Sequence, residues 1–231
     1  MHRNTLMLFE KYAKRYFKDN MKVLEIGPND HPSSFLKNLN NKSIEWHTLD
    51  IQNAVIKSRR NKCTYIIKNV YKFPIKNNTY DIVISGNVIE HVKKIWIWIN
   101  EITRVCKKGG YVITINPISF PYHESPFDCW RIYPEGMKAL YKDAGLKVIL
   151  SKFESLEEKV LRKHGFRCTY PGPTPLPEAF MSFPEYCKEI FTNYNHPRKN
   201  YRSLKLFGKK IIGWPISCMT DTITVGKKNK K

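Results

Sequence analysis

The sequence is informative first for what it lacks. No apolar run approaches the roughly 18 residues that a membrane-spanning helix requires, and charged residues interrupt residues 1–17 every few positions. Such a segment is not typical of a secretion signal, so we expect a cytoplasmic protein without a membrane span. An amphipathic helix is predicted there instead, with Thr5 as a candidate N-cap.

Cysteine forms no pattern that builds a metal site. The six cysteines are widely scattered, with no CxxC pair and no nearby cluster of Cys and His. In a cytosolic chain this spacing is typical of buried or incidental thiols. No acidic cluster calls for a divalent ion either, so the sequence predicts no metal.

Acidic residues are scarce beside basic ones, with 20 Asp and Glu against 40 Lys and Arg, and a net charge of +20. A basic surface attracts nucleic acid, anionic lipid or phosphorylated small molecules. The alternative is a solvated surface, because the whole chain is rich in Lys and Asn. We expect an anionic small molecule as the partner, with nucleic acid as the second possibility.

Short apolar runs alternate with helical periodicity along most of the chain. Buried strands are predicted over 21–27, 44–51, 63–70, 80–86, 111–117 and 147–154, and helices over 93–110, ended by Gly109 and Gly110, and over 134–146. Residues 221–226 alternate and predict a seventh strand near the sheet edge. The expected fold class is α/β, with a doubly wound, seven-stranded, mostly parallel sheet.

We interpret residues 1–231 as a single domain. Residues 1–20 form its N-terminal helix and residues 21–154 its cofactor-binding core. Residues 155–219 break the alternation with a proline-rich stretch and are predicted to be an insertion that caps the substrate site. Residues 220–231 hold the last strand and a basic tail.

Candidate ligand-binding residues stand where the predicted strands end. Glu25 and Gly27 close the first strand, and Asp50 closes the second, 23 residues after Gly27. Gly27 allows close approach of the backbone to a ligand, and an acid at the second position can accept both hydroxyls of a ribose. Asn69-Val70 and Ser85-Gly86-Asn87 follow the third and fourth strands.

These segments together resemble the class I S-adenosylmethionine-dependent methyltransferases. The resemblance rests on VLEIG, LDI, NVYKFPIKNNTYDIVISGNVIEHV and RVCKKGGYVITINP, in that order and spacing. It covers residues 21–117 closely and the rest of the chain loosely. It implies a Rossmann-like fold with S-adenosylmethionine as the cofactor.

The resemblance also implies roles for single residues. Glu25 and the Ser85 carbonyl would hold the methionine amino group, Gly27 and Pro28 would shape the loop beneath it, and Asp50 would bind the ribose. The adenine would lie between Ile51 and Val70 with Asn69 at its edge, and Asn87 belongs to the same candidate cofactor site. The alternatives are buried strand ends for Ile51 and Val70, and a helix cap for Asp50.

One departure concerns Pro28, which stands where the family usually has a second glycine. Proline cannot donate an N–H, so this loop is expected to differ locally from that of the family. The same absence of further glycines leaves no GxGxxG pattern, which argues against a dinucleotide such as NAD.

The stretch 121–131 collects chemically active side chains after the fifth strand. His123 is a candidate base at neutral pH, Asp128 is a candidate to orient it or to act itself, and Arg131 can bind a phosphate or carboxylate. Trp130 and Tyr122 complete the candidate substrate site. The alternative is a loop in which Asp128, Arg131 and Trp130 simply pack together.

This HxxPxDxWR stretch resembles one found in methyltransferases of bacterial surface-glycan and small-molecule pathways. It implies an O-methyltransferase acting on a sugar, a nucleotide-linked sugar or another phosphate-bearing small molecule. An RNA or DNA methyltransferase is the second hypothesis, although no NPPY-like signature follows the fourth strand. A noncatalytic cofactor-binding protein is the third, motivated by Pro28.

Overall fold

The computed structural model describes residues 3–28, 30–51, 63–120, 122–123, 126–156, 168–169, 204–206, 209–211, 216–217 and 220–230. The chain divides into two compact units, one made of residues 1–157 and 219–231 and the other of residues 158–218. In the second unit, β7 (Cys168–Thr169) pairs in parallel with β10 (Ile216–Ser217), and β8 (Leu204–Leu206) pairs antiparallel with β9 (Lys209–Ile211). The candidate site belongs to the first unit.

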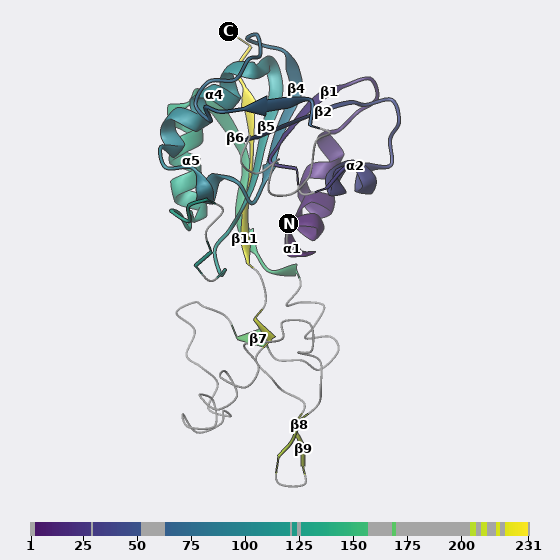
Figure 1. Ribbon diagram of the computed structural model, residues 1–231, viewed down its shortest axis with the longest axis vertical. Helices are drawn as coiled ribbons and strands as arrows, with labels where there is room; N and C mark the ends of the chain where they lie inside the picture. The colour runs from purple at the N-terminus through teal and green to yellow at the C-terminus, as the bar shows by residue number, and fades with distance from the viewer. Residues whose placement is uncertain are drawn as a thin grey trace. The chain divides into compact units, whose positions relative to one another are not determined.

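One seven-stranded sheet forms the centre of the first unit (Figure 1), in the order β3-β2-β1-β4-β5-β11-β6. The neighbours from β3 to β5 run parallel, whereas β11 runs antiparallel to both β5 and β6. The predicted α/β class and mostly parallel seven-stranded sheet are therefore confirmed. The strands are β1 (Lys22–Ile26), β2 (Glu45–Ile51), β3 (Tyr65–Ile67), β4 (Tyr80–Gly86), β5 (Cys106–Pro117), β6 (Leu146–Glu154) and β11 (Asp221–Lys228).

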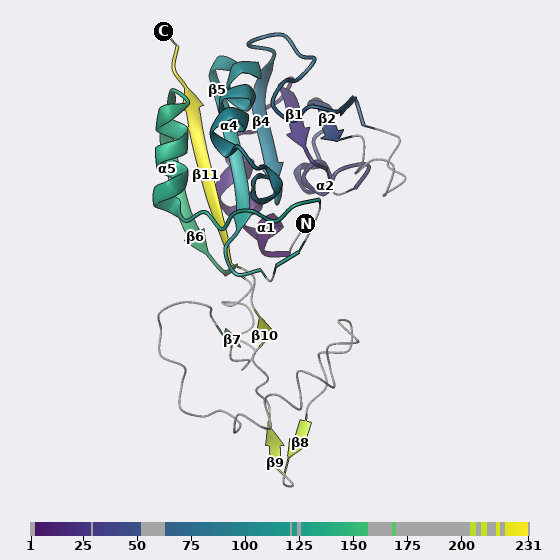
Figure 2. The same ribbon diagram turned by 60° about the vertical axis from the view of Figure 1, so that its left-hand side comes forward.

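Helices cover both faces of this sheet (Figure 2). On one face, Trp98 of α4 (Ile95–Val105) and Tyr141 of α5 (Pro134–Asp143) are fully buried in one apolar cluster. On the other face, a second cluster holds Phe9 and Phe35. These residues come from the N-terminal helix, which runs as α1 (Arg3–Leu8), η1 (Phe9–Ala13) and η2 (Lys14–Tyr16), and from α2 (Ser34–Leu39).

The helix predicted over 93–110 is shorter than its glycines suggested. It ends at Val105, and the chain continues as β5 from Cys106, which pairs with Tyr80. A Cβ atom on Gly110 would lie 2.6 Å from the Asp81 carbonyl oxygen. Gly110 therefore permits close strand contact and does not end the helix.

Two further sequence predictions concern β11 and Thr5. Strand β11 is the second strand from one edge of the sheet, between β5 and the edge strand β6, as predicted, and its Thr224 hydroxyl lies 3.0 Å from the Ser151 hydroxyl. Thr5 is not an N-cap, since α1 already begins at Arg3, and its hydroxyl instead reaches Asn87 beyond β4. Within the described residues, no helix combines the length and apolarity needed to cross a bilayer.

Candidate active site

An open cleft of about 200 Å³ lies at the carboxyl ends of β1, β2 and β4. Strands β1 and β4 are neighbours in the sheet, although β2 and β3 separate them in the sequence. The strand order reverses between them, and open α/β sheets bind ligands at such a point. The cleft is lined by Glu25, Ile26, Gly27, Leu49, Asp50, Ile51, Ile67, Val70, Phe73, Gly86, Asn87, Val88, His91, Val92, Trp98 and Pro126.

Glu25 places a buried carboxyl in the wall of this cleft. Its side chain is only 1% exposed, and the indole N–H of Trp46 on β2 donates a hydrogen bond to Oε2 at 2.9 Å. Burial raises the pKa of Glu25 to about 7, although the hydrogen bonds from Ser33 and Trp46 lower this pKa in part. The carboxyl therefore gains or loses its proton near neutral pH.

Gly27 turns the chain sharply where β1 ends. Its φ angle is +67°, and its N–H donates to the Leu49 carbonyl at 2.8 Å. A Cβ atom at this position would lie 2.5 Å from Cγ2 of Val88, which also lines the cleft. Glycine is therefore required both by the backbone conformation and by the space. Pro28, next in the chain, is buried and is not among the lining residues.

Asp50 is a second acidic residue of the cleft and lies at the end of β2, which β1 separates from β4 in the sheet. It is 8% exposed, and its Oδ1 accepts the backbone N–H of Ile51 at 2.8 Å. The side chains of Ile51 and Val70 pack against the apolar cluster that includes Phe73. The cleft therefore combines two carboxyls with an apolar wall.

Six of the nine predicted cofactor residues come together in this cleft. These are Glu25, Gly27, Asp50, Ile51, Val70 and Asn87. Pro28, Asn69 and Ser85 adjoin lining residues in the sequence but are not themselves among them. The Oδ1 atom of Asn69 accepts the N–H of Tyr71 at 2.9 Å, and Ser85 is a buried residue of β4.

The loop predicted to carry catalysis is organised around Asp128. Arg131 donates to both Asp128 oxygens, at 2.5 and 2.7 Å, and also to the Phe120 carbonyl at 3.0 Å. The Asp128 side chain is 2% exposed. Hydrogen bonds from the Arg131 guanidinium lower the pKa of Asp128 to about 2, so this carboxylate is ionised throughout the physiological range.

His123 is held by the same carboxylate. Its backbone N–H donates to Oδ2 of Asp128 at 2.8 Å, and its Nδ1 lies 3.3 Å from that oxygen. Its ring makes edge contacts with Phe120 and with His91, at centroid distances of 4.6 and 4.9 Å. The predicted association of His123 with Asp128 is thus present in the geometry, whereas its catalytic use stays a prediction.

The other loop residues are placed differently. The indole N–H of Trp130 donates to the Val92 carbonyl at 2.9 Å, and its ring packs against the apolar cluster. This placement favours the packing alternative for Trp130, as the pairing with Asp128 does for Arg131. Tyr122 is 73% exposed.

Glu90 was not singled out by the sequence, although it lies beside the predicted base. It belongs to the 3-10 turn η3 (Ile89–His91) directly after β4, and its side chain is 1% exposed. Desolvation, with the nearby charges of Asp221 and Asp128, raises the pKa of Glu90 to about 8. An acid next to a histidine in the otherwise apolar segment VIEHV was the signal available in the sequence.

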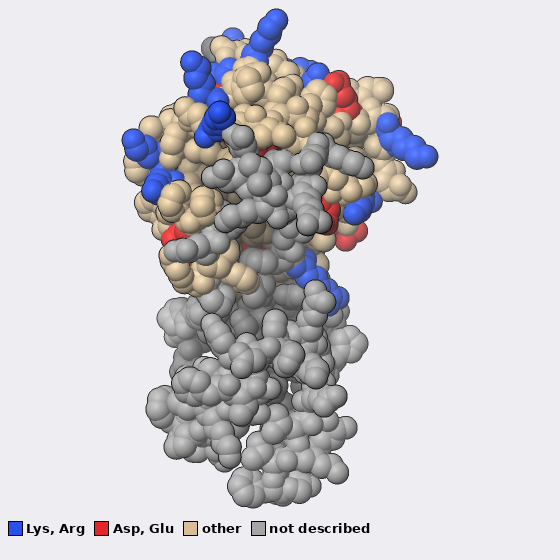
Figure 3. All heavy atoms as spheres, viewed as in Figure 1, with Lys and Arg blue, Asp and Glu red and all other residues tan. Residues whose placement is uncertain are grey.

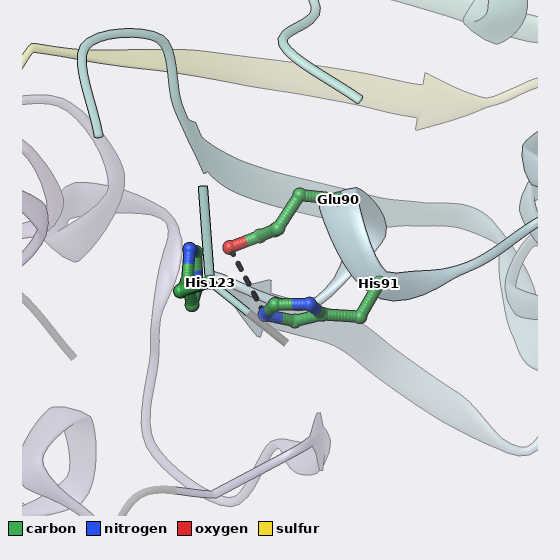
Figure 4. A group of neighbouring side chains, drawn as sticks. All are labelled: Glu90, His91 and His123. Carbon is green, nitrogen blue, oxygen red and sulfur yellow. Dashed lines mark ion pairs between the residues drawn. The ribbon is translucent and has the colours of Figure 1, made fainter. Parts of the chain in front are cut away.

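Glu90, His91 and His123 converge on one another (Figure 4), and of the three only His91 lines the cleft. One carboxylate oxygen and one ring nitrogen of each histidine all lie within 4.8 Å of one another. Nε2 of His91 is 3.7 Å from the Glu90 carboxylate. His91 also lines the main cleft.

A second lobe adjoins the main cleft and has a basic rim. It shares Ile51, Val70 and His91 with the main cleft and adds Lys68 and Lys93. On the face drawn in Figure 3, the Lys and Arg side chains of the described residues are spread singly or in small groups. A single broad basic surface of the kind that follows a nucleic-acid backbone is not visible among the described residues on that face.

Comparison with known proteins adds two kinds of information. Residues 24–114 match the family model described as a methyltransferase domain. The fold is similar to that of an S-adenosylmethionine-dependent methyltransferase from Archaeoglobus fulgidus, with a TM-score of 0.57, 18% identity, and coverage of 97% of this chain and 92% of that one. At that identity the likeness concerns the fold.

Two curated relatives match shorter segments. An uncharacterized protein of Methanocaldococcus jannaschii is 34% identical over 107 residues, which are 45% of this chain and 46% of that protein. An uncharacterized methyltransferase of Schizosaccharomyces pombe is 38% identical over 56 residues, which are 24% of this chain and 20% of that protein. The chain thus spans less than half the length of these curated relatives.

Proposed function

We propose that this chain, whose residues 24–114 match a methyltransferase domain, transfers a methyl group from S-adenosylmethionine to a hydroxyl of an anionic small molecule. A sugar phosphate or a nucleotide-linked sugar is the acceptor class that we favour. The observation that carries the proposal is that His91 both lines the cofactor cleft and belongs to a cluster with Glu90 and His123.

The chemistry of the cleft suits S-adenosylmethionine. Asp50, at the end of β2, has the carboxylate that the two ribose hydroxyls require, and Ile51 and Val70 offer apolar surfaces for the adenine. The ionised Glu25 would accept the ammonium group of the methionine part. Gly27 keeps the backbone open beside that group, since any Cβ there would collide with Val88.

When bound, S-adenosylmethionine supplies a methyl group on a positively charged sulfur, which keeps the C–S electron pair as the acceptor oxygen forms the new C–O bond. The residues of the chain align the acceptor with that methyl, and alignment accounts for much of the rate in such displacements. The hydroxyl proton passes to His123. Asp128 holds that ring through Nδ1, while Arg131 keeps Asp128 in place.

The preference for an anionic acceptor rests on the second lobe. Lys68 and Lys93 stand on its rim, and His91 joins it to the cofactor cleft. A phosphate bound by these lysines would lie in the lobe that His91 also lines. Arg131 is used by Asp128 and the Phe120 carbonyl, so the lysines are the better candidates for the phosphate contact.

The experiment is an acceptor search with cofactor that carries a deuterated methyl group. Cell extract, a panel of sugar phosphates and nucleotide sugars, and total RNA are each incubated with the protein and analysed by mass spectrometry. The proposal expects a mass increase in small phosphorylated sugars. Labelling confined to RNA would contradict the acceptor class, and labelling of no fraction would contradict the activity.

A variant identifies the residue that takes the proton. His123→Ala is expected to keep cofactor affinity, because His123 is not among the lining residues of the cofactor cleft. Its turnover should fall by about 100-fold, as general bases contribute roughly 10²–10⁴ to a rate. Unchanged turnover would remove His123 from the mechanism.

A further inference from the structure

The proposed methyl transfer does not explain the buried carboxyl of Glu90. Its side chain is almost fully buried, and neither carboxylate oxygen has a hydrogen-bond partner among the other described residues. Leaving a carboxyl without a partner in an apolar interior costs free energy. A buried acid in that state, facing two imidazole rings (Figure 4), points to a ligand.

We propose that Glu90, His91 and His123 bind a divalent first-row transition-metal ion, with Zn²⁺ and Fe²⁺ as the best fits. Two imidazoles and one carboxylate form the donor set typical of such ions, whereas Mg²⁺ and Ca²⁺ prefer oxygen ligands. The site goes beyond the proposed methyl transfer. Its position at the acceptor end of the cleft rests on that proposal, but the binding of the metal does not.

The histidines are held as metal-binding histidines usually are. Nδ1 of His91 bonds the Phe127 carbonyl oxygen, which can only accept, so the proton is on Nδ1 and the lone pair on Nε2. Nδ1 of His123 lies 3.3 Å from the ionised Asp128, which places the His123 lone pair on Nε2 in the same way. A carbonyl or carboxylate behind the ring is the common arrangement around a bound metal.

The spacing of the three groups requires only a small adjustment. Their ligand atoms lie within 4.8 Å of one another. Bonds of about 2.1 Å in tetrahedral geometry place ligand atoms about 3.4 Å apart. The Nε2 of His91 and the Glu90 carboxylate are already 3.7 Å apart, so the ligand atoms need to come closer by at most about 1.4 Å for the site to close.

Charge around the cluster favours a dication. The Glu90 carboxyl is influenced by the carboxylates of Asp128 and Asp221 and by one guanidinium, that of Arg131. With all four groups ionised, these side chains leave an excess of two negative charges. A dication bound at the cluster would balance this excess.

The proposal also changes the role of His123. Three protein ligands leave a coordination position open, as in catalytic metal sites. An acceptor hydroxyl bound there would lose its proton more readily, because the metal stabilises the oxyanion. With the metal present, His123 is a ligand. The proton then passes to solvent.

Metal binding can be measured without acceptor or cofactor. Full-length protein without a purification tag is stripped with a chelator and titrated with Co²⁺ by visible absorption, and with Zn²⁺ by calorimetry. We expect one ion per chain at this site, unaffected by millimolar Mg²⁺. Glu90→Gln and His123→Ala should each weaken the affinity for Co²⁺ and Zn²⁺ at least tenfold, because each removes a ligand.

His47→Gln is the matched control, since His47 is a partly buried histidine that pairs with Glu45 and Tyr80, away from the cluster. It should leave the titration unchanged. Folding of each variant is checked by circular dichroism, and Glu90→Gln preserves the shape of the side chain. Absence of tight binding by the parent protein, or binding that both ligand variants retain, overturns the proposal. Because methylation is assayed separately, that result leaves the proposed function standing with His123 as the base.

Discussion

Trp46 donates its indole N–H to Oε2 of Glu25 at 2.9 Å, so a residue of β2 fixes the carboxyl at the end of β1. This bond joins the two strands whose ends form one side of the cleft. It also keeps the carboxyl buried, where burial is the main cause of its raised pKa. The pH dependence of cofactor binding follows from that placement.

Cofactor affinity should rise with pH through about 7. Burial raises the pKa of Glu25 from 4.5 to about 7, and only the ionised form pairs with an ammonium group. Below pH 7 the affinity should fall by about tenfold per unit. Calorimetric titrations between pH 5.5 and 8.5 measure this dependence, and Glu25→Gln should abolish it. Equal slopes for both proteins would contradict the assignment.

The stability of the cofactor-free protein should change in the opposite direction. The unfolded chain loses the Glu25 proton near 4.5 and the folded chain near 7. Glu25 therefore contributes about 3 kcal/mol to the free energy of unfolding. This contribution is complete below about pH 4.5 and is lost as the pH rises through 7. Urea unfolding of the parent protein and of Glu25→Gln across this range isolates the effect of Glu25.

Thr5 connects the N-terminal helix to the cofactor cleft. Its hydroxyl donates to Oδ1 of Asn87 at 3.1 Å, and Asn87 lines the cleft. Thr5→Val should cost about 1 kcal/mol of stability and weaken cofactor binding several-fold. The control is Thr103→Val, whose hydroxyl donates to Ile99 within α4 at 2.8 Å. An equal effect of both variants on cofactor affinity would argue against this connection.

Alanine substitutions at two glycines with left-handed backbone conformations distinguish the cost of backbone strain from the cost of steric crowding. Gly27 has φ +67° and Gly145 has φ +76°, but a Cβ would meet Val88 at 2.5 Å only at Gly27 and nothing within 4 Å at Gly145. Alanine should cost about 1 kcal/mol at either position from the backbone alone. Only Gly27→Ala should also weaken cofactor binding, and calorimetric titration of both variants with the cofactor measures the difference.

Asp128 and Arg131 should stabilise the loop far more than a surface ion pair does. Arg131→Ala leaves a carboxylate that is 2% exposed without its main partner, and we expect a loss of about 2–3 kcal/mol. Lys138→Ala removes the exposed pair with Glu135, which is 84% exposed, and should change stability by less than about 0.5 kcal/mol. Similar losses in urea unfolding would count against a structural role for the Asp128–Arg131 pair.

The sequence predicted the sheet well because its signals are local. Short, mostly apolar runs such as YDIVISG favour buried strands, and they appear as β4 and its neighbours. The helix end at Val105 was missed because Gly109 and Gly110 resemble a helix stop. The actual role of Gly110, in the approach of β5 to Asp81, depends on a contact between strands.

The site was predictable where strand ends define it. Asp50 and Gly27 are at strand ends by their place in the sequence, and both line the cleft. Glu90 could not be predicted as a site residue from strand ends. Its place in the site comes from burial beside His91 and His123, and His123 is 33 residues away in the sequence. Tertiary contacts of this kind have no periodicity to reveal them.

Asp50 offers the most direct test of the central claim, that the ends of β1, β2 and β4 bind S-adenosylmethionine. Calorimetry with the cofactor compares the parent protein with Asp50→Asn, which keeps the size but removes the charge. The account predicts binding by the parent protein, weakened about 10- to 100-fold in the variant, because a hydrogen bond to a charged group contributes about 1.5–3 kcal/mol. No binding by the parent protein, or equal binding by both, would contradict it.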